Sequence, residues 1–270
     1  MNNNHVPVMI NEVLSFIPSD KKINLIDATF GGGGYSRAIL KDFNIKNLIA
    51  IDRDPISKIF YEELKKDFDN IELFNQKFSK LDELLRYSEH YIEKYDVIIF
   101  DLGVSSNQID NPERGFSFQK DGPLDMKMGS SNLNAFEVIN SFDEKKLADI
   151  LYEFGEEKYS RRIAKNIVIN RTKKTIDNTL ELSEIIKKSV PFKYNSKKIH
   201  PATKTFQALR IFVNDEINEL KIVLEKSENL LANDGLLIIV SFQSLEDRIV
   251  KDFFNHKSGK RWCSSRHLPD

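Results

Sequence analysis

The chain has 270 residues, of which 40% are hydrophobic and 30% charged, and its formal net charge at pH 7 is −1. A chain of this size can bury one good core or a core with a smaller insertion, and its composition is that of an ordinary globular protein. The longest wholly aliphatic run, 236–240, is too short to cross a bilayer, and the first five residues lack the features of a secretion signal. A single cysteine, Cys263, excludes an internal disulfide framework and a cysteine-rich zinc site. We therefore expect a cytoplasmic protein without a membrane segment or a metal.

A glycine-rich loop follows the first predicted strand. The strand signal at 23–26 leads into four consecutive glycines at 31–34, and a helix-like run extends from Ser36 to Lys41. Because glycine lacks a Cβ and tolerates positive φ, such a turn lets a ligand approach the backbone N–H groups closely. The dinucleotide fingerprint Gly-x-Gly-x-x-Gly is incomplete, since Ser36 stands where the third glycine belongs. The loop predicts a ligand site without identifying the ligand.

Two acidic residues narrow the choice of ligand. Asp27 ends the first strand signal, and Asp52 ends the second, at 47–52, which places its carboxylate 19 residues after Gly33. That distance is typical of a carboxylate that accepts both hydroxyls of an adenosine ribose. A phosphate beside Asp27 would bring two anions together in a partly buried site. S-adenosylmethionine has no phosphate, and its sulfonium and amino groups suit an acidic pocket, so the residues favour it over NAD.

Strand and helix signals alternate along the first hundred residues. Strands are predicted at 71–74 and 96–102 and helices at 62–68 and 80–94, which indicates an α/β fold with a doubly wound, mostly parallel sheet. The next strong strand signal is 235–242, and its Leu236 lies 135 positions after Asp101, whereas a βαβ crossover needs about 30 residues. Roughly 100 residues are therefore inserted after the fourth strand. We predict an S-adenosylmethionine-binding α/β domain of residues 1–106 and 207–270, and an inserted helical domain of residues 107–206.

The insertion is predicted to be helical and basic. Helices are expected at 145–154, 156–171, 180–189 and 203–213, the last running on to 231. Between residues 151 and 210 the chain has fourteen Lys and Arg but six Asp and Glu, a local excess of eight positive charges. Such a segment in a nearly neutral protein fits a nucleic-acid partner, although a solvated helical face explains the same charges equally well. The insertion leaves the sheet at the edge where α/β sheets bind ligands, so it is well placed to hold a large substrate.

Several segments together, in chain order, resemble the ribosomal RNA small subunit methyltransferase H family. The matching segments are HVPVM (5–9), DATFGGGGYS (27–36), AIDRDP (50–55), FDLGVSSNQ (100–108), ERGFSF (113–118), DGPLDMKM (121–128), HPATKTFQALR (200–210) and SFQSLEDR (241–248). The resemblance covers nearly the whole chain and implies a class I methyltransferase-like fold. It also implies transfer of a methyl group from S-adenosylmethionine to the exocyclic N4 of a cytidine in the decoding region of 16S rRNA. The expected partner is 16S rRNA or the small ribosomal subunit, with the protein acting as a monomer or homodimer.

The resemblance also implies a set of site residues. The family's cofactor contacts fall on Gly33, Gly34, Tyr35, Asp52, Phe78, Asp101 and Gln108. Asp101 stands at the end of the fourth strand, where amino-methyltransferases generally keep an acid or an amide. The N4 amine of cytosine is a poor nucleophile and needs in-line placement and an acceptor for one of its hydrogens. We therefore expect Asp101 to be the catalytic residue that orients cofactor and amine together, rather than only capping nearby N–H groups.

The chain departs from the family pattern at three places. Tyr35 and Gln243 stand where the family commonly has histidine, so a mechanism that relies on imidazole at either position is in doubt. Family members also usually run on into a last antiparallel strand containing Arg-Ser-x-x-Leu-Arg, which this chain lacks before Asp270. An edge strand of the sheet is therefore expected to be missing.

The insertion supplies candidate contacts to RNA. A target base must leave its stack and be received by aromatic or apolar side chains. The candidates are Phe116, Phe118, Pro123 and Met126, although each of them alone is more typical of the core of the insertion. The cations expected to hold phosphates are Arg161, Arg162, Lys165, Arg171, Lys173, Lys174, Lys197, Lys198 and Lys204. Two alternatives to the favoured function stay open: a methyltransferase with another acceptor, and a catalytically weak RNA-binding assembly factor that keeps a degenerate cofactor fold.

Overall fold

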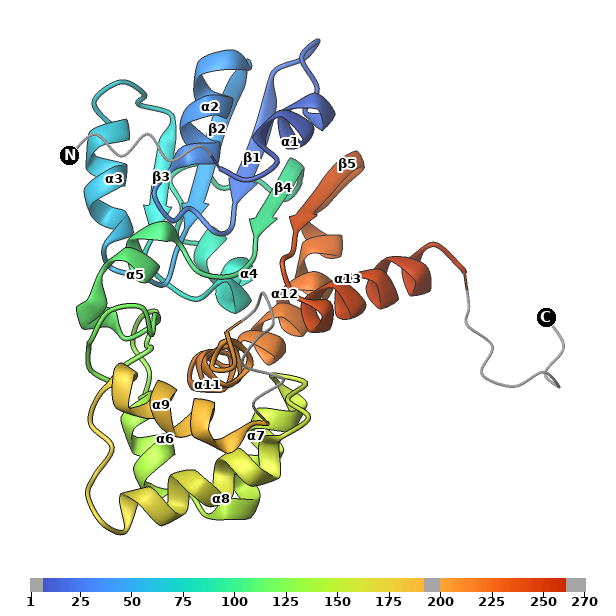
Figure 1. Ribbon diagram of the computed structural model, residues 1–270. Helices are drawn as coiled ribbons and strands as arrows, with labels where there is room; N and C mark the ends of the chain where they lie inside the picture. Colours follow the sequence, from blue (N-terminus) through green and yellow to red (C-terminus); the bar gives the residue numbers. More distant parts are fainter. Residues whose placement is uncertain (1–6, 192–199, 261–270) are drawn as a thin grey trace, which may run out of the picture. The chain divides into compact units, whose positions relative to one another are not determined.

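The computed structural model describes residues 7–191 and 200–260, and the chain divides into two compact units (Figure 1). The first unit consists of Met1–Gly103 with Ile217–Asp270, and the second of Val104–Glu216. The second boundary therefore lies ten residues beyond the predicted position of 206. The reason is that α11 (Thr203–Asn214) packs against α6 (Ala135–Ser141) and α7 (Glu144–Glu153) of the second unit.

The first unit is built on a five-stranded parallel sheet, as the sequence predicts. The strands are β1 (Ile23–Asp27), β2 (Ile45–Ile51), β3 (Ile71–Phe74), β4 (Tyr95–Asp101) and β5 (Leu231–Val240). Their order across the sheet is β3-β2-β1-β4-β5 (Figure 1). The chain runs outward from β1 to β3 and then returns to the other side of β1, so the topological switch point lies between β1 and β4. Ligands of open α/β sheets bind beyond the carboxyl ends of the strands at such a point.

Each face of the sheet carries its own layer of helices. Successive strand residues point to opposite faces, so Leu25 joins one buried cluster and Ile26 the other. The cluster with Leu25 is covered by α1 (Ile10–Phe16), α2 (Gly34–Asp42) and α3 (Ser57–Leu64). The cluster with Ile26 is covered by α4 (Leu81–Leu85), α12 (Glu216–Leu230) and α13 (Ser244–Lys257). The predicted helix at 80–94 is wrong in length, because α4 ends at Leu85 and 3-10 helix η1 (Phe78–Lys80) precedes it.

Strand β5 differs from its prediction at both ends. Tyr95 pairs with Leu231 and Val97 with Leu236, so β5 carries a bulge in which Asp234 has φ 61. The predicted start at residue 235 is therefore wrong, because the Gly-containing turn sequence at 232–235 is an irregularity inside the strand rather than the turn before it. The strand ends at Val240, and residues 241 and 242 lie beyond it, at the carboxyl edge of the sheet.

The second unit is helical, as predicted. Within its described residues the helices are α5 (Ser106–Asp110), 3-10 helix η2 (Pro112–Arg114), α6, α7, α8 (Ser160–Arg171), α9 (Thr179–Ser189) and α11. They enclose a single buried cluster to which each helix from α6 onward contributes. Side-chain caps define the starts of several helices: Asp143 accepts a hydrogen bond from the Lys146 N–H, and Asn178 from the Glu181 N–H.

Candidate functional site

Three acidic residues stand at the carboxyl ends of the three central strands. Asp27 is the last residue of β1, Asp101 is the last residue of β4, and Asp52 follows β2 directly. Because β2, β1 and β4 are neighbours and run parallel, their carboxyl ends share one edge of the sheet. The acids therefore flank the switch point, where the fold binds ligands.

The glycine loop connects β1 to α2 at the same edge. Gly31 and Gly33 have φ of 53° and 74°, in the left-handed region that glycine adopts without strain. A Cβ on Gly33 would lie 2.8 Å from Cζ of Phe30, so the turn is also tightly packed. Helix α2 begins at Gly34, immediately after the turn. Gly33 and Gly34 therefore bring bare backbone close to the acidic edge.

Asp27 accepts hydrogen bonds from residues on both sides of the glycine loop. The residue is 1% exposed, and its carboxylate accepts hydrogen bonds from Ser36 Oγ at 2.6 Å and from the Thr29 N–H at 3.3 Å. Burial raises the pKa of Asp27 to about 6, although these two donors favour the charged form. Ser36, which interrupts the dinucleotide fingerprint, is thus the partner of this acid. Sequence reasoning missed that role, since only the folded loop brings the two side chains together.

Asp52 ties the loop to the second strand. Its Oδ2 accepts the Gly31 N–H at 2.6 Å and its Oδ1 accepts the Asp54 N–H at 2.7 Å. Burial nevertheless raises the pKa of Asp52 to about 6. A carboxylate has about four lone-pair sites, so each oxygen can accept a further hydrogen bond, for example from a hydroxyl group. Asp52 is therefore suited to hold a vicinal diol against the loop.

Asp101 has the most strongly perturbed carboxyl group of the three. Its Oδ1 is buried and finds no hydrogen-bond partner within residues 7–191 and 200–260, while its backbone N–H donates to Thr29 Oγ1 at 2.6 Å. Burial, reinforced by the charge of Asp27, raises the pKa of Asp101 to about 7. A buried polar atom without a partner is costly, and perturbed carboxyls of this kind concentrate at functional sites. Asp101 is thus set up to accept a hydrogen bond from a ligand.

The hydroxyl of Tyr35 is hydrogen-bonded to the backbone just before α1. The ring is buried in the first turn of α2, and its hydroxyl donates a hydrogen bond to the Val8 carbonyl. Burial, followed by the charges of Asp101, Asp27 and Glu12, raises the pKa of the Tyr35 phenol well above its usual range. The hydroxyl therefore stays protonated and cannot replace the titratable histidine of the family pattern.

The two remaining residues implied by the resemblance lie in different units. Phe78 opens η1 after β3 in the first unit and packs edge-on against Phe100, with ring centroids 5.8 Å apart. Gln108 is a residue of the second unit, where its side chain accepts the Ser105 N–H and completes the capping box of α5. Its visible role is structural.

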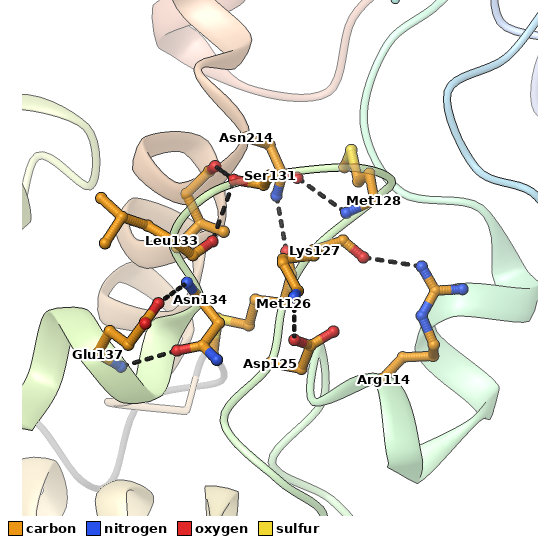
Figure 2. Close-up of polar contacts among 11 residues, drawn as sticks. Arg114, Asp125, Met126, Lys127, Met128, Ser131, Leu133, Asn134, Glu137 and Asn214 are labelled. Atoms are coloured by element: carbon orange, nitrogen blue, oxygen red, sulfur yellow. Dashed lines mark hydrogen bonds and ion pairs between the residues drawn. The ribbon is translucent and has the colours of Figure 1, made fainter. Parts of the chain in front are cut away.

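The DGPLDMKM segment of the second unit is a braced loop (Figure 2). Asn214 is fully buried; its Nδ2 donates to the Met126 carbonyl at 2.7 Å and its Oδ1 accepts the Met128 N–H at 2.8 Å. Arg114 donates to the Lys127 carbonyl at 2.8 Å on the other side of the loop. Met126 is 0% exposed and belongs to the core of the second unit, so the core interpretation holds for this candidate and it is not available to a target base.

The two aromatic candidates in the second unit, Phe116 and Phe118, are partly buried and pack against its core. Phe118 stacks on His200 with centroids 4.6 Å apart, and His200 Nδ1 accepts the Ala202 N–H. Burial and the charge of Lys187 lower the pKa of His200, which keeps its ring neutral at pH 7.

The predicted phosphate-binding cations divide into two groups. Arg161, Arg162 and Lys165 are exposed on α8, and Lys173 follows that helix, also exposed. Arg171 instead donates to the Ile139 and Phe142 carbonyls, both at 2.5 Å. Lys204 likewise donates to a backbone carbonyl, that of Glu156, and Lys174 pairs with Asp177 and Glu181. Lys197 and Lys198 lie outside the described residues. Arg171 and Lys204 thus brace the fold, which leaves the exposed face of α8 as the basic surface.

Among the described residues, no helix is both long enough and apolar enough to cross a membrane. No group of three or more His, Cys, Asp or Glu side chains within residues 7–191 and 200–260 is arranged to hold a metal ion.

Comparison with known proteins assigns the chain to a family. A protein of Rickettsia massiliae named ribosomal RNA small subunit methyltransferase H is 47% identical over 275 residues, which cover all of this chain and 86% of the relative. A protein of the same name from Rickettsia canadensis is 48% identical and covered to 85%. A solved rRNA methylase from Streptococcus thermophilus aligns over 35% of this chain and 53% of its own, at 24% identity and a TM-score of 0.28, which is too weak a likeness for structural comparison. Residues 2–269 match the MraW methylase family, and the chain therefore belongs to that family.

Proposed function

We propose that this protein transfers a methyl group from S-adenosylmethionine to the exocyclic N4 of a cytidine in the decoding region of 16S rRNA. The observation that carries the proposal is the Asp101 carboxyl at the switch point of the sheet, whose buried Oδ1 has no hydrogen-bond partner among the described residues. Membership of a methylase family and the names of the relatives, which are ribosomal RNA small subunit methyltransferases, support the acceptor.

The residues at the sheet edge fit the proposed methyl donor. Three carboxyls with raised pKa values favour a cationic ligand, because a positive charge stabilises their ionised forms. Asp52 would hold the ribose hydroxyls, and Gly33 and Gly34 would admit the methionine part close to the backbone. When bound, S-adenosylmethionine supplies an electrophilic methyl group on a sulfonium.

Asp101 gives the site its chemistry. An exocyclic amine delocalises its lone pair into the ring, so it reacts only when it is held in line and one of its hydrogens is accepted. The Asp101 carboxylate can accept a hydrogen bond from one N–H of the amine. As the N–CH3 bond forms and the S–CH3 bond breaks, the nitrogen becomes cationic, and the carboxylate can then take up that one proton to leave the neutral methylated amine. Direct transfer to an amine requires no covalent nucleophile, which suits an edge lined by carboxylates. A uracil would present its O4 acceptor to the same carboxylate and be repelled.

The second unit would contribute the contacts to RNA. We assign this role to the exposed cations of α8, Arg161, Arg162 and Lys165, which would bind phosphates in a sequence-independent way. Replacing all three by Gln should weaken RNA binding and reduce its salt dependence, while leaving the affinity for S-adenosylmethionine unchanged.

A labelling experiment tests the proposal. The protein is incubated with methyl-labelled S-adenosylmethionine and either 30S particles or naked 16S rRNA, and the modified nucleoside is identified by mass spectrometry. We expect N4-methylated cytidine with at least one of the two substrates, and loss of transfer in Asp101→Ala. Cofactor binding without label in either RNA would support the assembly-factor alternative, and label on another molecule would support another acceptor.

A further inference from the structure

An exposed aromatic ring stands beside the acidic edge of the sheet. Phe242 follows the end of β5 and is 55% exposed, and it belongs to none of the three buried clusters of the described residues. Burial in the core therefore does not explain a phenylalanine at this position. Large exposed rings near a candidate site are suited to contact a ligand.

The position of Phe242 relative to Asp101 is fixed by strand pairing. Asp101 is in register with Val240, and the Leu102 N–H donates to the Val240 carbonyl at 2.9 Å. Phe242 and Gly103 each lie two residues beyond this pair, and they meet there: a Cβ on Gly103 would be 3.6 Å from Phe242 Cδ2. Gly103 has φ 118, a conformation that side chains rarely adopt. The ring is thus held against bare backbone, two residues from the proposed catalytic acid.

We infer that Phe242 is the platform on which the target cytosine stacks, an assignment that rests on the proposed function. A base taken out of an RNA stack loses contact with its neighbours and regains it on an aromatic side chain. The carboxyl beside the ring reads the exocyclic amine, and the ring itself holds the base plane. The base is thus expected to contact Phe242 of the first unit rather than Met126 of the second unit, which is buried.

Substitution separates stacking from a structural role. Phe242→Leu keeps an apolar side chain without a ring, and Phe242→Trp restores a ring. The matched control is Phe254→Leu, because Phe254 is an exposed ring of the same unit, 41% exposed, about 15 Å along α13 from its first residue. Methyl transfer to 30S particles or 16S rRNA is measured at saturating S-adenosylmethionine, and cofactor affinity by calorimetry.

We expect Phe242→Leu to lower kcat/KM for RNA by about tenfold to a hundredfold, the range of one base–aromatic stack. Phe242→Trp should recover most of the loss, Phe254→Leu should match the wild type, and all variants should bind S-adenosylmethionine equally well. Equal activity of Phe242→Leu and Phe254→Leu, or a loss in Phe242→Leu that Trp does not recover, would overturn the assignment alone. Absence of cytidine methylation by the wild-type protein would instead overturn the proposed function and this inference with it.

Discussion

Replacing Asp101 by Asn should make the free protein more stable at pH 8 while abolishing methyl transfer. The folded protein raises the pKa of this carboxyl from 3.8 to about 7, so its ionised form is disfavoured by folding. Each pKa unit corresponds to about 1.4 kcal/mol, which gives roughly 4 kcal/mol at pH 8. Because the residue keeps some exposure to solvent, we expect a gain of about 2–4 kcal/mol from the neutral amide.

The sign of this effect depends on pH. The unfolded chain ionises near pH 4 and the folded protein only near pH 7, so Asp101 lowers the free energy of unfolding progressively as pH rises across that interval. The advantage of Asp101→Asn should therefore be small below pH 4 and reach its full value above pH 7. Urea unfolding followed by far-UV circular dichroism, without S-adenosylmethionine, measures it.

Asp96 provides the matched control on the same strand. Burial opposes its ionisation, but hydrogen bonds from Lys21 Nζ and the Asn24 N–H outweigh it and lower the pKa of Asp96. Asp96→Asn should consequently destabilise the protein at pH 8 and have little effect at low pH. A gain in Asp101→Asn that is independent of pH, or a loss of stability at pH 8, would refute the reasoning that burial and Asp27 raise this pKa.

Four further predictions concern the loops and the ligand. Asn214→Ala leaves two buried backbone groups without partners and should lower the free energy of unfolding by about 3 kcal/mol. Asn140→Ala removes similar bonds at a partly exposed position and should lower it by about 1 kcal/mol. Equal losses in urea unfolding would contradict this. Gly33→Ala should weaken binding of S-adenosylmethionine by about tenfold or more in calorimetry, because alanine is strained at φ 74 and meets a packed ring; unchanged affinity would show that the loop adapts. Tyr35→Phe should cost about 1 kcal/mol of stability yet keep the rate of methyl transfer within about twofold, because its hydroxyl is a donor to the backbone; a large fall in kcat would assign it a catalytic role. The affinity for S-adenosylmethionine should fall as pH drops from 8 to 5.5, since carboxyls with pKa values of about 6 to 7 then take up protons; a flat titration would argue against acids holding the cation.

The parts of the site that depend on local spacing were predictable from sequence. Asp27, the glycines and Asp52 follow one another at distances that the strand–turn–helix unit itself determines. The interactions that each side chain makes in the fold were harder to predict from the sequence. Ser36 looked like a missing glycine, yet it is the hydrogen-bond partner of Asp27 in the folded loop.

Long-range packing explains what the sequence left open or mispredicted. Met126 was either a candidate base contact or a core residue, and the choice depends on Asn214, 88 positions later, which holds its loop inside the second unit. The start of β5 was misjudged because a Gly-containing turn signal also suits a bulge, and only pairing with β4 distinguishes the two. The place of Phe242 next to Gly103 could not be read from the sequence either, since it depends on which strand pairs with β4.

The position of the insertion has a consequence for how the chain folds. Strands β1 to β4 are complete within the first 101 residues, but β5 pairs with β4 only after the whole second unit has been synthesised. Closing a loop of that length carries an entropic cost that grows slowly with length, and pairings between distant segments slow folding. During synthesis on the ribosome, the second unit therefore has time to form its own core before β5 emerges. Until then β4 lacks its partner on that side, so the fifth strand, and with it Phe242 beside the acidic edge, joins the sheet last.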